Sequence, residues 1–306
     1  MINQENESIV EKHLFKTRNG EAILQRLSNN STLQPVLFIH GFNSSEKIWY
    51  SYKNRGIYYE GFAEKALEDG YDVWLLGLSK SKMANLIELA EDDLLSALIT
   101  IFSITNKKIK IVAHSMSGVL CRYLTHPVYY EKTRSDIMEF MVDEIVTLAT
   151  PHQGFTVKQK FKNKISSLFE HFEIWASKKR RNPLYSGFFQ FLSQSEFFIT
   201  LNTNFYFNPA IKWTNAVAKH DFFIHKSSIL PTETMQGVDQ KFFNVNHFKV
   251  PFSDIIITIK NKFSLKSPKM DFFTTPPIYW SVDVYNWIFK IESENSKFMD
   301  SLLAVF

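Results

Sequence analysis

The chain has 306 residues, of which 45% are apolar and 22% are charged. This length and balance fit one large globular domain, or two small ones at most, and they exclude disordered, collagen-like and coiled-coil chains. The formal net charge of +4 is too small to indicate nucleic acid, so we expect no nucleic-acid partner.

Three features of the chain bear on its location. A single cysteine, Cys121, allows no intrachain disulfide, so a secreted scaffold built on disulfides is not expected. The first residues, MINQENESIVEKH, lack the apolar centre of a signal peptide. The longest apolar stretch, 94–104, contains Ser and Thr and is too short to span a bilayer. These features predict a cytoplasmic protein.

The order of the predicted elements indicates an α/β fold. Residues 13–27 predict a hairpin that turns at Asn19–Gly20. The run 36–39 lacks polar alternation, as expected of a strand buried on both faces of a parallel sheet. Acidic residues 91–93 predict the start of a helix that ends near 105. The other expected elements are helices at 59–69 and from 116, and strands at 71–78, 108–115 and 144–150. This alternation predicts a doubly wound, mostly parallel sheet with helices on both faces.

The alternation lapses between about 155 and 210 and resumes at a strand near Ala216. A gap of that length predicts an inserted helical cap rather than a structureless loop. We therefore expect one domain over 1–306, with a cap at about 155–210 and a C-terminal extension at about 265–306. The aromatic, helix-like run in this extension is expected to pack on the domain or to shape a pocket mouth, with an exposed amphipathic face as the alternative.

The segment IVAHSMSG (111–118) places Ser115 between a predicted strand and a predicted helix. A tight strand-to-helix turn requires small neighbours, and the start of a helix directs free N–H groups at a developing oxyanion. The segment resembles the nucleophile elbow of the α/β-hydrolase superfamily, written G-x-S-x-G. Here the outer positions are Ala113 and Ser117, which are small, and Gly118 follows at once. The alternative interpretation is a strand that ends in a capping serine.

Two further segments resemble parts of the same superfamily. In FIHGFN (38–43) a His-Gly pair follows a buried strand, as in the oxyanion loop, and Gly41 lets the backbone turn close to the substrate. The backbone N–H groups of Phe42 and Met116 are the expected oxyanion donors. The segment TLATPHQG (147–154) is typical of the lipase and esterase branches, and we interpret His152 within it as structural.

The acid is expected after the nucleophile, because the order in this superfamily is Ser, acid, His. Asp221 is the expected acid, since its segment resembles the D-G-x-V-P-x-x-S pattern. It departs from that pattern in having Phe222 and His225 where Gly and Pro are usual. Glu233 and Asp239, both expected in the loop before the base, are the alternatives, and Asp221 as a merely polar strand end is the remaining interpretation.

The expected base is His247, in NVNHFKVPF (244–252). It resembles the closing histidine of the superfamily, which is flanked by Asn and an aromatic residue. Its separation from Asp221 leaves room for a helix and a short strand. His220 and His225 flank the acid too closely to reach Ser115 while sharing its turn.

Together these segments resemble lipase- and esterase-type α/β-hydrolases over about residues 34–260. The opening hairpin, Trp49, Asn54 and the strand DVWLL (72–76) are similar to acid-lipase-like members, and there is a related similarity to hydrolase domains attached to some sterol oxidases. The resemblance implies acyl transfer through an ester on Ser115, with His247 as base and Asp221 orienting it. It implies neither a metal nor a cofactor.

The distribution of phenylalanine bears on the substrate. The chain has 29 Phe residues, and 11 of them lie in 155–207, about twice the share of an even spread. They predict either the core of the cap or an apolar acyl-chain tunnel. We expect an apolar ester substrate that contacts Gly41, His114, Phe188 and Phe198.

Two other functions stay open, a thioesterase and a non-catalytic hydrolase-fold protein that binds a lipid or a partner. The basic run Lys178–Arg181 is interpreted as a solvated helix end or loop, with contact to a lipid surface as the alternative. The sequence makes no prediction of the oligomeric state.

Overall fold

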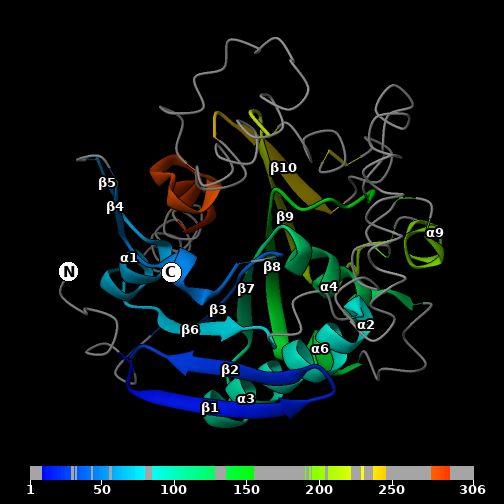
Figure 1. Ribbon diagram of the computed structural model, residues 1–306, viewed down its shortest axis with the longest axis horizontal. Coiled ribbons are helices and arrows are strands. Elements are labelled where there is room, and N and C mark those ends of the chain that lie inside the picture. Colours follow the sequence, from blue (N-terminus) through cyan, green and yellow to red (C-terminus); the bar gives the residue numbers. More distant parts are fainter. Residues whose placement is uncertain are drawn as a thin grey trace, which may run out of the picture.

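The structure is a computed structural model in which a twisted eight-stranded sheet carries helices on both faces (Figure 1). It describes residues 9–28, 31, 33–42, 44–54, 57–79, 85–127, 136–154, 190, 193, 195–203, 206–221, 229–230, 237–245 and 277–289. The strand order is β1-β2-β6-β3-β7-β8-β9-β10. The strands are β1 (Glu11–Thr17), β2 (Gly20–Arg26), β3 (Pro35–Ile39), β6 (Asp72–Gly77), β7 (Ile109–His114), β8 (Val142–Leu148), β9 (Lys212–Ala218) and β10 (Val238–Phe243). A separate hairpin pairs β4 (Tyr52–Asn54) with β5 (Ile57–Tyr59).

The strands β3, β6, β7, β8, β9 and β10 are all parallel to one another, and β1 and β2 complete the sheet as an antiparallel hairpin. Their carboxyl ends therefore share one edge of the sheet, where ligand sites of open α/β sheets lie. Each residue of β3, β6 and β7 is buried, which follows from apolar runs that are covered on both faces. The predicted α/β fold class is confirmed.

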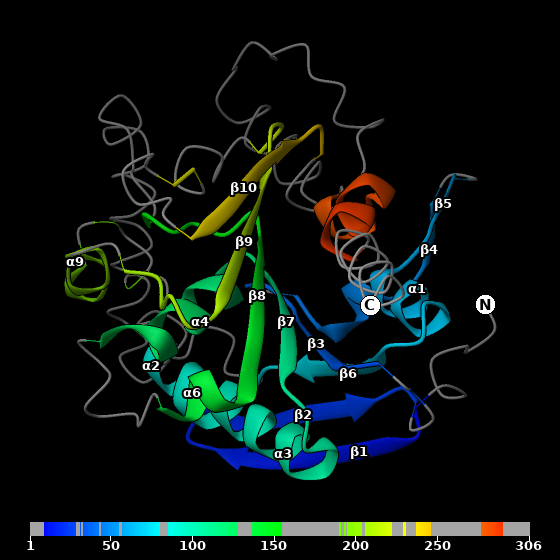
Figure 2. The ribbon, with the colours of Figure 1, turned by 180° about the vertical axis from the view of Figure 1, so that it is seen from behind.

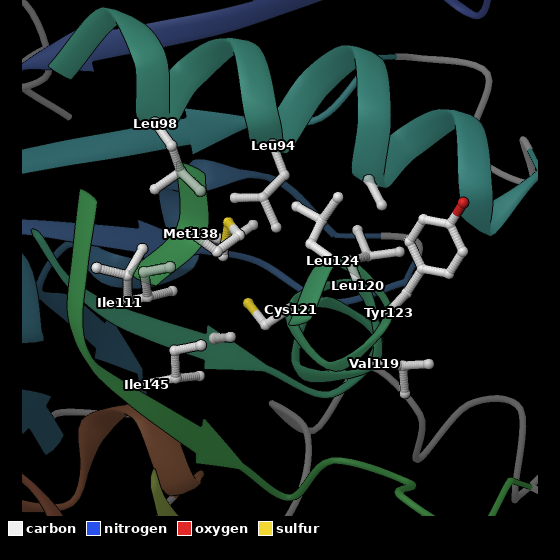
Figure 3. Packing of buried hydrophobic residues seen from close by; sticks show 14 of the residues in the cluster. Leu94, Leu98, Ile111, Val119, Leu120, Cys121, Tyr123, Leu124, Met138 and Ile145 are labelled. Carbon is white, nitrogen blue, oxygen red and sulfur yellow. The ribbon is translucent and has the colours of Figure 1, made fainter. Parts of the chain in front are cut away.

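The helices divide between the two faces of the sheet, and two hydrophobic clusters follow this division (Figures 1 and 2). The first face carries α2 (Leu86–Glu88), α3 (Leu95–Thr105), α4 (Met116–Thr125), α6 (Asp136–Met141) and α9 (Glu196–Asn202). Figure 3 shows the centre of this cluster, where Leu120, Cys121 and Leu124 of α4 lie between the sheet and Leu94 and Leu98. The second face carries α1 (Phe62–Glu68) and residues 277–289, which include a helix over 282–289.

Residues 277–289 belong to the core of the second face, although they lie beyond the segment that resembles known hydrolases. The ring of Tyr279 packs edge-on against Trp49 at 6.1 Å, and Tyr285 packs edge-on against Phe62 at 5.4 Å. Lys110 of β7 is fully buried, and its Nζ donates to the carbonyl of Ile288 at 3.0 Å. This segment therefore packs on the domain, as expected, and the alternative of an exposed amphipathic face does not apply to it.

The expected helix start at residues 91–93 is wrong. The helical stretch begins at Leu86, and Asn85 caps it by accepting from the N–H of Ile87. The acidic residues lie in a π-helical turn, Leu89–Leu94, before α3 continues. This turn shifts the side chains out of a regular helical register, and Asp93 faces the interior with no exposed surface.

The expected loop position of Asp239 is also wrong. Asp239 is the second residue of β10, pairs with Thr214 of β9 and is exposed. The polar residues of β10 reflect its place at the edge of the sheet, where the strand is partly exposed to water. Within the ranges listed above, the helices are all too short or too polar to cross a bilayer.

Much of the predicted cap lies outside the described residues, including Lys178–Arg181 and Phe188. The described part of this segment contains α9, which begins after the N-cap residue Ser195. Phe197 and Phe198 of α9 are buried in the cluster on the first face, and Phe197 stacks on Tyr123 of α4 at 5.9 Å.

Candidate active site

Ser115 occupies the turn between β7 and α4, at the carboxyl edge of the sheet. Its backbone has φ 55° and ψ −117°, a conformation that non-glycine residues rarely adopt and that costs on the order of 1–3 kcal/mol. Its N–H donates to the carbonyl of Leu148 at 2.8 Å, so the pairing of β7 with β8 continues into the turn. This is the strained strand-to-helix geometry that the sequence predicts for a nucleophile elbow.

Small residues let this turn close. A Cβ at Gly118 would lie 2.2 Å from Oγ1 of Thr150, because the first turn of α4 packs directly on the loop after β8. That loop is itself strained, since Ala149 has φ 47° and its N–H donates to the carbonyl of Ala216 at 2.8 Å. Gly118 thus meets the steric requirement that the motif predicts.

The loop after β3 lies against the elbow. A Cβ at Gly41 would be 2.8 Å from the Cβ of Ser115 and 2.9 Å from Nδ1 of His114, so only glycine fits there. His40 is buried; its Nε2 accepts from the N–H of Leu78 at 3.1 Å, and its Nδ1 contacts the carbonyl of Gly41 at 2.8 Å. Because Nε2 must accept, the proton resides on Nδ1, which donates to that carbonyl.

A second contact joins the loop after β3 directly to the first turn of α4. The hydroxyl of Ser117, on the first turn of α4, donates to the carbonyl of His40 at 2.5 Å, and Ser117 has no exposed surface. Sequence reasoning treated Ser117 only as a small substitute for glycine. The signal available was its hydroxyl, but the partner lies 77 residues away in the chain.

The expected oxyanion donors belong to these two segments, the loop after β3 and the first turn of α4. Phe42 follows Gly41 in a turn, and Met116 is the first residue of α4. The N–H groups of a helix's first turn have no acceptor within the helix, so they are available to a ligand. Their role as oxyanion donors stays a prediction.

Asp221 follows β9 at the same edge of the sheet and is 4% exposed. Beyond the ends of β9 and β10 the two segments stay side by side. The backbone N–H of Lys219 donates to the carbonyl of Phe243 at 2.9 Å, and the backbone N–H of His220 donates to the carbonyl of Val245 at 3.2 Å. The expected base His247, and the alternative acid Glu233, lie outside the described residues. The alternative acid Asp239 lies at the amino end of its strand, away from this edge.

His152 is fully buried, and its contacts support the structural interpretation. Its Nε2 lies 3.1 Å from Oγ1 of Thr147, which donates to Oδ1 of Asn215 at 3.0 Å. Burial lowers the pKa of His152 well below 6.5, and the charge of Arg122 adds to this effect. The imidazole is therefore neutral and part of a polar chain that crosses β8 and β9.

Arg122 of α4 connects this polar chain to α9. It is fully buried and donates to the carbonyls of His152 at 2.6 Å and Leu201 at 2.5 Å, and to Oδ1 of Asn202 at 2.9 Å. Leu201 and Asn202 end α9, and a cation at a helix C-terminus is favourable. Burial lowers the pKa of Arg122 to about 9.

Two of the four residues predicted to contact substrate are packed in the interior. His114 is 1% exposed, and its ring lies edge-on to Tyr279 at 5.0 Å. Phe198 has no exposed surface and packs in the core of the first face. Phe197 and Phe198 of α9 are thus core residues. Phe188 lies outside the described ranges, and Gly41 lies beside Ser115.

A buried carboxyl that the sequence did not single out lies behind the carboxyl end of β6. Oδ2 of Asp93 accepts from the N–H of Ser79 at 2.6 Å. Burial raises the pKa of Asp93 to about 6, and the hydrogen bond from Ser79 acts in the opposite direction. In the part of the chain described, no group of three or more His, Cys, Asp or Glu residues could hold a metal ion.

Comparison with known proteins agrees with this geometry. Residues 29–180 match the family described as "Putative serine esterase (DUF676)". No curated protein matches the chain. The matched segment, residues 29–180, contains the loop after β3, the elbow and the loop after β8.

Solved structures of low identity share the fold. The propeptide form of lipase BlEst2 from Bacillus licheniformis is 14% identical, with a TM-score of 0.52 over 82% of this chain and 55% of that chain. Aspergillus fumigatus lipase B is 14% identical, with a TM-score of 0.48 over 70% of this chain and 48% of that chain. The chain therefore spans about half the length of these two lipases. By its sheet order and its elbow, the chain has the α/β-hydrolase fold, which agrees with the serine esterase match over residues 29–180.

Proposed function

We propose that this protein is a serine hydrolase that cleaves carboxylic esters with an apolar acyl chain or alcohol. The observation that carries the proposal is that Ser115, at positive φ, lies directly against the loop that contains Gly41. A Cβ added at Gly41 would be 2.8 Å from the Cβ of Ser115. A strained serine at a helix start, beside a second loop with backbone N–H groups, is the arrangement that acyl transfer needs.

In the proposed reaction, Oγ of Ser115 attacks the ester carbonyl carbon while His247 takes the hydroxyl proton. The N–H groups of Phe42 and Met116 stabilise the tetrahedral oxyanion, each contributing about 3 kcal/mol. The intermediate collapses as His247 returns the proton to the departing alcohol. Water then repeats the sequence on the acyl-enzyme and releases the acid. Asp221 orients His247 and stabilises its charged form.

Chain connectivity supports the pairing of Asp221 with His247. Val245, whose carbonyl accepts from His220, is the last described residue before the base. Two residues of extended chain span at most about 7 Å, and this short separation from Val245 is compatible with the proposed pairing of His247 with Asp221. Ser115, Asp221 and Val245 all follow carboxyl ends of parallel strands at one edge of the sheet.

The substrate class rests on the composition of residues 155–210, which we propose as a cap over this edge. Arg122 supports this assignment, since it ties the end of α9 to the nucleophile helix. With p-nitrophenyl esters of increasing length, turnover that rises with chain length supports an apolar acyl site. Replacing Phe188 by Ala should then reduce long-chain hydrolysis more than short-chain hydrolysis, and equal losses would assign the aromatic residues to the core alone.

The decisive experiment is labelling with a fluorophosphonate, which forms a stable adduct on an activated serine. We expect wild-type protein and Ser281→Ala to label and to hydrolyse esters, and Ser115→Ala to do neither. Ser281 is a matched control, because it is 5% exposed and lies in the C-terminal segment. Ester hydrolysis by Ser115→Ala would refute the assignment of the nucleophile. If wild-type protein neither labels nor turns over any ester or thioester, the protein is a non-catalytic binding protein.

A further inference from the structure

The hydroxyl of Ser117 stands where the elbow motif of the superfamily has glycine, and it makes a contact that glycine lacks. It is fully buried, and its donor reaches the carbonyl of His40 at 2.5 Å. A carbonyl oxygen only accepts, so the direction of this hydrogen bond is fixed. The contact joins the first turn of α4 to the loop after β3, which are the two segments that carry the expected oxyanion donors.

Two successive peptide planes, the second of which contains the N–H of Phe42, are each held through their carbonyl oxygens. Ser117 holds the plane between His40 and Gly41. Nδ1 of His40 holds the next plane, between Gly41 and Phe42, at 2.8 Å, while Leu78 holds the opposite ring nitrogen at 3.1 Å. In a trans peptide the N–H points opposite to the C=O, so fixing the carbonyl of Gly41 fixes the direction of the N–H of Phe42.

We propose that Ser117 is a positioning residue: by fixing the plane between His40 and Gly41, it helps to keep the next plane, and with it the N–H of Phe42, aimed at the developing oxyanion beside Ser115. The inference rests on the proposed function, and it concerns one of the two positions at which this chain departs from the elbow motif. The hydroxyl orients the donor during folding, so the donor needs no reorientation when the oxyanion forms. Its contribution therefore falls on the transition state and not on the bound ester.

The test is Ser117→Ala, measured per active site by burst titration, with Thr125→Ala as the matched control. Thr125 lies on the same helix, is 1% exposed and donates only to carbonyls of its own helix, those of Cys121 and Arg122. We expect kcat of Ser117→Ala to fall about tenfold or more, with KM unchanged within about twofold. The control should keep wild-type kcat per titrated site.

A second readout separates positioning from a merely structural role. Butylboronic acid forms a reversible tetrahedral adduct on an active serine, and its inhibition constant should rise in Ser117→Ala by the same factor by which kcat falls. If the alanine variant does not fold, Ser117→Cys keeps the volume with a weaker donor and should show the same pattern to a smaller degree.

Three outcomes are distinguishable. Equal loss of kcat and of boronate affinity supports the proposal. Wild-type kcat and wild-type boronate affinity per titrated site in both Ser117 variants would overturn it, even with a lowered melting temperature, and would leave the proposed function standing. A wild-type protein inert to the fluorophosphonate and to every ester would overturn both.

Discussion

Replacing Asp93 by Asn should stabilise the protein, and the gain should grow with pH. The pKa of Asp93 is raised from 3.8 to about 6, chiefly by burial. The folded state therefore binds the proton more tightly than the unfolded state, and the stability contributed by the protonated carboxyl is lost as the pH rises from about 3.8 to about 6. Asparagine cannot ionise, and its carbonyl can still accept from the N–H of Ser79.

The size of the effect follows from the two pKa values. The free energy of unfolding of the variant should exceed that of the wild type by about 0.6 kcal/mol at pH 4, about 1.6 kcal/mol at pH 5 and about 3 kcal/mol at pH 8. Urea unfolding at these three pH values, followed by circular dichroism, measures the difference. The largest gain belongs at the highest pH, because there the wild type must bury a carboxylate.

Asp92→Asn is the matched control, on the neighbouring residue of the same turn. Hydrogen bonds from Arg18 lower the pKa of Asp92, so its carboxylate favours folding above about pH 4. This variant should be less stable than wild type at neutral pH, and the loss should disappear as the pH falls through that lowered pKa. A gain for Asp93→Asn that does not vary with pH, or no gain at pH 8, would refute the burial argument.

Three further predictions concern packing, charge and catalysis. Gly118→Ala should destabilise the protein by about 1–3 kcal/mol because its methyl meets Thr150, and Thr150→Ala should recover part of that loss when the two changes are combined in a double-mutant cycle. Lys110→Met should cost about 3 kcal/mol in urea unfolding, because the cation lies 2.8 Å from Oε2 of Glu144; adding Glu144→Leu should cost no more, and a larger double loss would contradict a pairing role. Asp221→Asn should lower kcat by orders of magnitude while Glu233→Gln lowers it little, and the reverse result would move the acid.

The strand β3 was predictable because its burial follows from an uninterrupted apolar run. The strand over 36–39 has no polar residue, and the structure buries every residue of β3. The elbow was predictable for a similar reason, since small residues around Ser115 satisfy a local steric demand. Both predictions rest on residues that are close together in the chain.

The misses involve contacts between distant residues or polar residues in unusual places. The strand β10 carries polar residues because it lies at an edge, and Asp239 within it was expected in a loop. The true helix start had a local signal in Asn85, but the acidic run 91–93 suggested a later start. The bond from Ser117 to His40 spans 77 residues, and no local pattern encodes it.

The contacts of residues 277–289 have a consequence for how the protein is made. Lys110, at the start of the nucleophile strand, is bonded to Ile288, which lies 178 positions later, and Tyr285 donates to Asp69 across 216 positions. During synthesis the strand that leads to Ser115 leaves the ribosome long before these partners exist, and until they arrive one face of the sheet is only partly covered. A nascent chain that lacks residues 277–289 is therefore expected to stay loosely packed and dependent on chaperones, and the proposed catalytic centre is expected to form only when the helix over 282–289 packs on the sheet.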